Sequence, residues 1–170
     1  SECLLKNKKA DPEAISNLLR QLAQDGPEHY FGLFRHSEGA FRKAVESLPD
    51  KAAHYRSEQN ISGCGYATLS IPIALYHQAN SPALLQQCIE TCLLLSNSPW
   101  EVVGSALTGF MANTFLAIKS DDAESVRSAD ILHSAAEFAE QAESYFQTHY
   151  PDLWNKNDGE NARALSRTIR

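Results

Sequence analysis

The sequence has no excess of basic residues: its 170 residues include 15 Lys and Arg against 21 Asp and Glu, a net charge of −6. Nucleic-acid-binding domains gather Lys and Arg on one face, so this composition argues against a nucleic-acid partner. No apolar run approaches the roughly 18 to 20 residues that span a bilayer. The longest, Ile71–Tyr76 and Cys92–Leu95, have the length of core-helix segments. We therefore expect no membrane partner and a cytoplasmic location.

Cysteine is also scarce. Cys3, Cys64, Cys88 and Cys92 are too few for a disulfide framework in a chain of this length. Cys88 and Cys92 are four residues apart, on one face of an expected helix, and are predicted to pack as small hydrophobic residues. Zinc-ligand spacings, phosphate-binding loops and nucleophile elbows are absent from the sequence. These absences predict that the chain binds no metal and no cofactor.

Segments in which apolar and polar residues alternate are missing as well, whereas helix-start signals are dense. Asp11-Pro12-Glu13 places a cap residue, a first-turn Pro and an acid where each suits a helix start. Ser81-Pro82 is a second such signal, and Ser98-Pro99-Trp100-Glu101 has the spacing of a capping box. We predict an all-α fold, a compact orthogonal bundle of several helices, in a single domain that spans residues 1–170.

The helix expected after Ser98 is apolar nearly all round, up to Ile118. Such a helix normally lies at the centre of a bundle. Ser105, Gly109 and Ala112 form a stripe of small residues along it, which predicts a close approach by a neighbouring backbone. Other helices are expected from Ser37 to Pro49 and from about Gly63 to Gln78.

A long amphipathic helix is predicted over residues 129–149, with Pro151 closing it and a last helix at 160–170. Its outer face is expected to carry three acids, Glu137, Glu140 and Glu143. The residues expected to face inward are Ile131, Leu132, Ala135, Phe138, Ala139, Ala142, Tyr145 and Phe146.

The order of segments between Ser62 and Lys119 carries a resemblance. Ser62-Gly63-Cys64-Gly65-Tyr66-Ala67-Thr68-Leu69 leads to an apolar helix and then to a second helix from Pro82 to Leu95. Ser96-Asn97-Ser98-Pro99 and the small-residue helix with Gly104-Ser105-Ala106-Leu107-Thr108-Gly109 follow. This order resembles the C-terminal part of the ADP-ribosylglycohydrolase family, including the dinitrogenase-reductase-activating type. The resemblance implies part of that family's helical fold over about residues 11–118, with a helical extension at 121–170.

In the family, aspartates in the loop before the small-residue helix hold magnesium, and the Ser-Gly-Tyr loop lies near bound ADP-ribose. The matching loop positions here are Ser96 and Ser98. Neutral hydroxyls are poor substitutes for the anionic oxygens that magnesium prefers, so the resemblance implies a fold without the metal site. The candidate ligand-binding residues are Ser62, Gly63, Gly65, Tyr66, Ser96, Asn97 and Ser98, with no catalytic residue and no metal ligand assigned.

Asp11-Pro12-Glu13-Ala14-Ile15 resembles the family's His-x-Asp-Pro-x-Ala-Ile segment, with Lys9 at the position of the His. This match implies that the chain corresponds to about the second half of a family member. Ser120-Asp121-Asp122 is only superficially similar to the family's second metal motif and is predicted to be a helix cap.

Three hypotheses follow. The first is a catalytically impaired ADP-ribosylglycohydrolase-like domain that binds ADP-ribose or a related small anion, acting as a binding or regulatory module. The second is an active ADP-ribosyl hydrolase with a divergent metal loop, and only this one requires magnesium. The third is an unrelated all-α interaction domain that uses residues 129–149 or the aromatic cluster Tyr30, Phe31 and Phe34. A protein partner or a homodimer would accompany the first or the third.

Overall fold

The computed structural model describes residues 2–24, 39–49, 56–57, 64–77, 82–118, 127–157 and 164–169. These residues form helices and connecting turns and include no strand, so the all-α prediction is confirmed for them. The helices are α1 (Glu2–Asn7), α2 (Pro12–Gln24), α3 (Gly39–Glu46), the 3₁₀ helix η1 (Cys64–Leu69), α4 (Ser70–Tyr76), α5 (Pro82–Cys92), α6 (Pro99–Ala117), α7 (Ser128–His149), α8 (Pro151–Lys156) and α10 (Ala164–Ile169).

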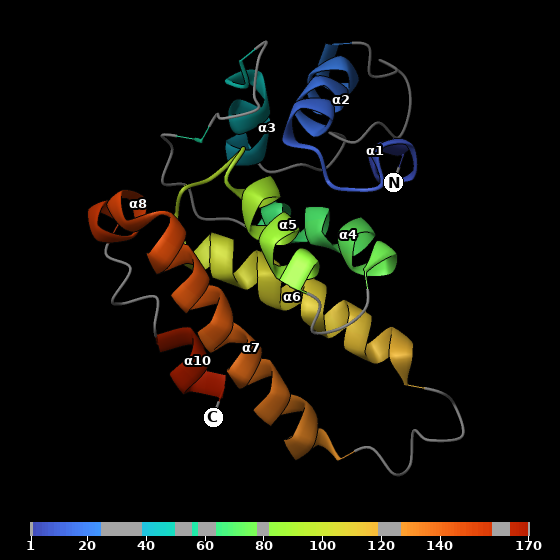
Figure 1. The fold of residues 1–170 in the computed structure, drawn as a ribbon. Helices are drawn as coiled ribbons and strands as arrows, with labels where there is room; N and C mark the ends of the chain where they lie inside the picture. The colour runs from blue at the N-terminus through green and yellow to red at the C-terminus, as the bar shows by residue number, and fades with distance from the viewer. Residues whose placement is uncertain are drawn as a thin grey trace.

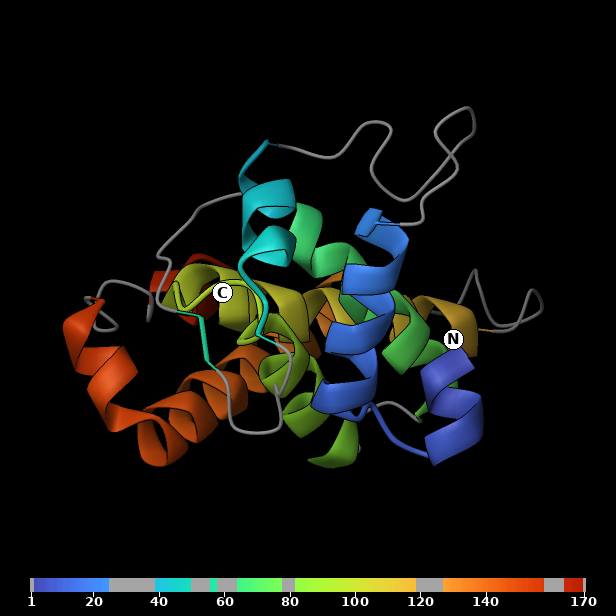
Figure 2. The same cartoon turned by 90° about the horizontal axis from the view of Figure 1, so that it is seen from above.

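Helices α1, α2 and α3 lie on one side of α4, α5 and α6, while α7, α8 and α10 lie on the other (Figure 1). The start of α2 follows the sequence signal, because the Asp11 carboxylate accepts a hydrogen bond from the backbone N–H of Ala14 at 3.3 Å. The backbone N–H of Ala10 donates to Oε1 of Gln87 on α5 at 2.5 Å. The second bond attaches the segment between α1 and α2 to the central layer, which Figure 2 shows from above.

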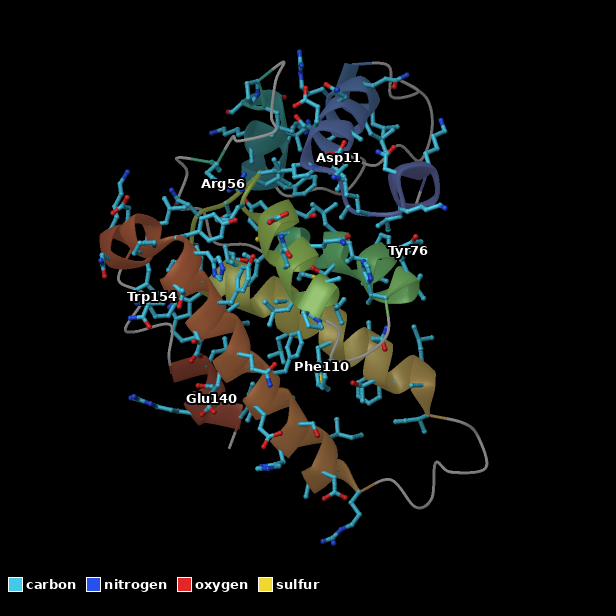
Figure 3. The ribbon with its side chains drawn as sticks, in the orientation of Figure 1. Asp11, Arg56, Tyr76, Phe110, Glu140 and Trp154 are labelled. Atoms are coloured by element: carbon cyan, nitrogen blue, oxygen red, sulfur yellow. The ribbon has the colours of Figure 1, made fainter. Side chains whose placement is uncertain are left out.

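Helix α6 is central, as predicted, because it contacts η1, α4, α5 and α7. Its Phe110 ring stacks on Phe138 of α7 with the ring centroids 4.5 Å apart, and Figure 3 shows Phe110 between these two helices. Burial is not complete, however: Phe115 and Leu116 are 56% and 64% exposed. The apolar residues near the end of α6 project beyond its neighbours.

Helix α4 runs parallel to α6 and very close to it. The Oγ atoms of Ser70 and Ser105 are 2.5 Å apart at one end, and Nδ2 of Asn113 donates to the carbonyls of Ala74 and His77 at the other. A Cβ atom added at Gly109 would lie 2.9 Å from Sγ of Cys88 on α5 and 3.3 Å from Cβ of Ser70 on α4. The small residues of α6 therefore permit the close approach that the sequence predicted.

Two residues of α7 were assigned to the wrong environment. Leu132, expected to face inward, is 49% exposed because it lies near the start of α7, where α7 diverges from α6 (Figure 1). Glu143, expected on the outer face, is 5% exposed. Its carboxylate accepts hydrogen bonds from the backbone N–H and the Oγ of Ser166, because α10 packs against that side of α7.

Two element boundaries also differ from the prediction. The segment after Gly63 was expected to start as an α-helix but begins as the 3₁₀ helix η1, and regular α-helix starts only at Ser70. Pro151 does follow the end of α7 but also starts α8, because a Pro is favourable at the first position of a helix. Among the described helices, none is both long enough and apolar enough to cross a membrane.

Candidate functional site

The loop between α5 and α6 is buried, with Ser96, Asn97 and Ser98 at 0%, 1% and 4% exposure. The backbone N–H of Ser98 donates to Oγ of Ser96 at 3.2 Å. Ser98 occupies the N-cap position of α6, but its side chain makes no capping hydrogen bond. The predicted capping box of Ser98 and Glu101 is therefore wrong. The Ser96 hydroxyl acts inside the loop instead, as a local acceptor that fixes the turn.

The side-chain amide of Asn97 is the most unusual group in this loop. Its Nδ2 and Oδ1 atoms are both buried, and neither has a hydrogen-bond partner. Its backbone carbonyl, in contrast, accepts a hydrogen bond from Nδ2 of Asn157 at 3.2 Å. A buried amide without a partner costs about 1–3 kcal/mol, and native proteins keep few such groups. Asn97 is thus a group for which a bound polar molecule would supply the missing bonds.

The Ser-Gly-Tyr loop is described only in part, since Ser62 and Gly63 lie outside the described residues. A Cβ added at Gly65 would lie 3.3 Å from Cδ2 of Phe41, so the absence of a side chain there admits the Phe41 ring. Tyr66 is fully buried, and its ring centroid is 5.9 Å from that of Phe41. Gly65 and Tyr66 therefore connect η1 to α3 within the core.

The structure places η1 against the two helices that the second candidate loop connects. η1 contacts both α5 and α6, and the loop of residues 96–98 joins those two helices. Four of the candidate residues lie beneath the surface rather than around an open cleft, because Tyr66, Ser96, Asn97 and Ser98 are all buried.

Residues 56–57 lie beside the end of α5, which leads into the candidate loop of residues 96–98. They were not singled out from the sequence. The backbone N–H of Ser57 donates to the carbonyl of Leu93 at 2.8 Å. The Arg56 guanidinium donates to the Tyr150 hydroxyl at 3.3 Å and lies 5.3 Å from the centroid of the same ring. Trp154, labelled with Arg56 in Figure 3, is 1% exposed and packs edge-on against Phe146. An isolated Arg in a polar stretch carries no sequence signal for such a contact.

Cys88 and Cys92 pack in the core as unpaired thiols, as predicted. Burial raises the pKa of the Cys88 thiol to about 12, an effect that a hydrogen bond with Ser70 partly offsets. Burial also raises the pKa of Cys92, with the nearby Glu101 carboxylate adding to it and a hydrogen bond with Ser105 opposing it. Because the thiolate is the reactive form, both thiols are inert at neutral pH.

A shallow depression of about 680 Å³ follows the outer side of α7 between Glu137 and His149, and its lining residues all belong to that helix. The Tyr145 and His149 rings stack there with centroids 3.9 Å apart. Burial raises the pKa of Tyr145, with Tyr150 and Glu90 adding to it and Arg56 opposing it. The depression has no opposite wall among these residues, so it would enclose a small molecule poorly.

Two features noted in the sequence lie outside the described residues, namely the aromatic cluster Tyr30, Phe31 and Phe34, and Ser120-Asp121-Asp122. Within the described ranges, no three His, Cys, Asp or Glu side chains are grouped so that they could hold a metal ion. The side chains of the candidate loop of residues 96–98 offer hydroxyl and amide oxygens rather than carboxylates.

Comparisons of the chain with models of protein families, with curated proteins and with solved structures found no match.

Proposed function

We propose that this chain is an ADP-ribosylglycohydrolase-like helical domain that binds ADP-ribose or a related small anion beside α6 without hydrolysing it. It would act as a binding or regulatory module. The observation that carries the proposal is the Asn97 side chain, which is buried at the start of a 19-residue helix and has no hydrogen-bond partner. The order of segments from Ser62 to Lys119 supports the choice of ligand class.

The chemistry of Asn97 suits this ligand. A carboxamide donates two hydrogen bonds and accepts others, so it can pair with ribose hydroxyls or with a base edge. The first N–H groups of α6 have no partner within the helix and favour a negative group. Glu101 places a carboxylate in the same turn, which opposes a highly charged anion. Asn97 is therefore the expected anchor, and the helix end a secondary contact.

The absence of hydrolysis follows from the oxygens that the loop offers. Ser96 and Ser98 carry neutral hydroxyls where the family carries magnesium-binding aspartates, and magnesium selects anionic oxygens in an octahedral set. Because the loop is buried, a ligand must displace local packing to reach Asn97. The ligand is therefore expected to associate slowly. Once bound, it should raise the melting temperature of the protein.

Isothermal titration calorimetry with ADP-ribose tests the proposal on the full chain. The wild type should bind, and Asn97→Asp should weaken binding at least tenfold, because the carboxylate loses both amide donors and repels the diphosphate. Asn17→Asp, on the exposed side of α2, is the matched control and should bind like the wild type. No binding by the wild type, or equal binding by Asn97→Asp, would contradict the assignment.

A second assay separates the proposal from an active, divergent hydrolase. ADP-ribosyl-arginine and ADP-ribosyl-serine should not be cleaved, with or without magnesium. Turnover that a chelator abolishes would establish the active enzyme and overturn the binding-module proposal.

A further inference from the structure

Helix α10 is attached to α7 by a buried polar contact and by apolar side chains. The backbone N–H and the Oγ of Ser166 both donate to the Glu143 carboxylate, at 3.2 Å and 3.0 Å. Leu165 and Ile169 pack on the core from the same helix, which lies along α7 in Figure 1. Ser166 and Glu143 are 3% and 5% exposed, so little water reaches this contact.

The Ser166 hydroxyl could not keep this contact if it carried a phosphate. Esterification removes the proton that Oγ donates to Oε2 of Glu143. The phosphorus and its three further oxygens would have to fit where Oγ and Oε2 are now 3.0 Å apart. A phosphate also brings a charge of about −1.5 to −2 at pH 7, which a neighbouring carboxylate repels. Each of these three effects favours release of α10 from α7.

Ser166 can become accessible without unfolding of the rest of the molecule. Helix α10 has six residues, and a helix this short is not stable by itself. Leu165 and Ile169 are only partly buried, so their separation from the core exposes little additional apolar surface. Segments with few buried contacts open locally at a small fraction of the global free energy of unfolding. The open form of α10 presents Ser166 to an enzyme.

The sequence around Ser166 indicates which class of enzyme would bind it. Residues 161–170 contain three Arg and no Asp or Glu, although the whole chain has a net charge of −6. Ser166 is also the only Ser or Thr of the chain with a Lys or Arg three residues before it, namely Arg163. Protein kinases select their substrates partly by such charge patterns, and a cationic segment complements an acidic substrate cleft.

We propose that Ser166 is a phosphorylation site for a protein kinase that recognises basic residues, and that the modification releases α10 from α7. Oγ of Ser166 attacks the γ-phosphorus of ATP, and the bond from that phosphorus to the β–γ bridging oxygen breaks. ADP leaves with the bridging oxygen, and the hydroxyl proton passes to the catalytic base of the kinase. The ligand proposal above does not depend on this site, since neither Ser166 nor Glu143 belongs to the loop of residues 96–98.

Phosphorylation of the full chain in vitro tests the site. ATP and a kinase that selects Arg three residues before its target should place phosphate on Ser166, as located by peptide mass spectrometry. Because access depends on the opening of α10, Glu143→Ala should react about tenfold faster than the wild type. Glu137→Ala is the matched control and should react like the wild type, since the Glu137 side chain is more than half exposed. A wild type without phosphate on Ser166, or equal rates for Glu143→Ala and the wild type, overturns the proposal.

Hydrogen exchange tests the release of α10. Ser166→phosphoserine, introduced during synthesis of the full chain, should raise the exchange rates of the amides of residues 164–169 by about tenfold or more. Ser144→phosphoserine is the control, because Ser144 is exposed on α7 and adds the same charge beside Glu143 without entering the contact. Its exchange at residues 164–169 should match that of the unmodified chain. Unchanged exchange in Ser166→phosphoserine, or an equal increase in both modified chains, contradicts the proposed release.

Discussion

At the residue scale, the two glycines of α6 face opposite environments. Gly109 lies against Cys88 and Ser70, where an added Cβ would be 2.9 Å and 3.3 Å from the nearest atoms, while Gly104 borders open space. In a helix interior, Gly costs about 0.5–1 kcal/mol relative to Ala. The same substitution should therefore have opposite effects at the two positions.

Gly104→Ala is expected to stabilise the folded chain by about 0.5–1 kcal/mol. Gly109→Ala gains the same propensity term but overpacks the contact with α4 and α5, at a cost of about 1–3 kcal/mol, and should be destabilising overall. Urea unfolding measures both values. Equal effects of the two variants, or a Gly109→Ala more stable than the wild type, would show that α6 is packed differently.

The sequence predicts one of these positions better than the other. Ser105, Gly109 and Ala112 recur on one side of the helix, and this pattern predicts a close neighbour. Gly104 belongs to no such pattern. The helix is apolar nearly all round, so residue type does not distinguish its exposed side from its buried side. Asn97 is a similar case: the sequence places it in the candidate loop, but only packing leaves both atoms of its amide without partners.

At the scale of elements, the polar attachment of α10 to α7 centres on Glu143. The carboxylate accepts from the backbone N–H of Ser166 at 3.2 Å and from its Oγ at 3.0 Å, and so satisfies an amide in the first turn of α10. Leu165 and Ile169 pack on the core from the same short helix. A six-residue helix is too short to be stable alone, so these contacts hold it in place.

Glu143→Ala should release α10, because hydrogen bonds to a charged group contribute about 1.5–3 kcal/mol. Hydrogen exchange at residues 164–169 should increase strongly, and urea unfolding should show a loss of that order. The control is Glu137→Ala, since Glu137 pairs at 3.2 Å with His133 and both side chains are more than half exposed. Its loss should stay within about 0.5 kcal/mol. Equal losses in the two variants would refute the docking role of Glu143.

Helix starts were predictable because local chemistry sets them. Asp11 precedes α2, and Pro12, Pro82 and Pro99 begin α2, α5 and α6. Pro151 was ambiguous, since Pro is frequent both after a helix end and at a helix start. The side of α7 that carries Glu143 could not be predicted, because its burial depends on where α10 packs. That packing is a long-range contact with no local signal.

At the scale of the whole molecule, charge and apolar surface are separated along the chain. Most charges lie before Gln59 and after Ile118, while the stretch between them includes η1, α4, α5 and α6 at the centre of the bundle. The separation leaves the central helices with almost no charged side chains, so apolar burial and hydrogen bonds hold them together.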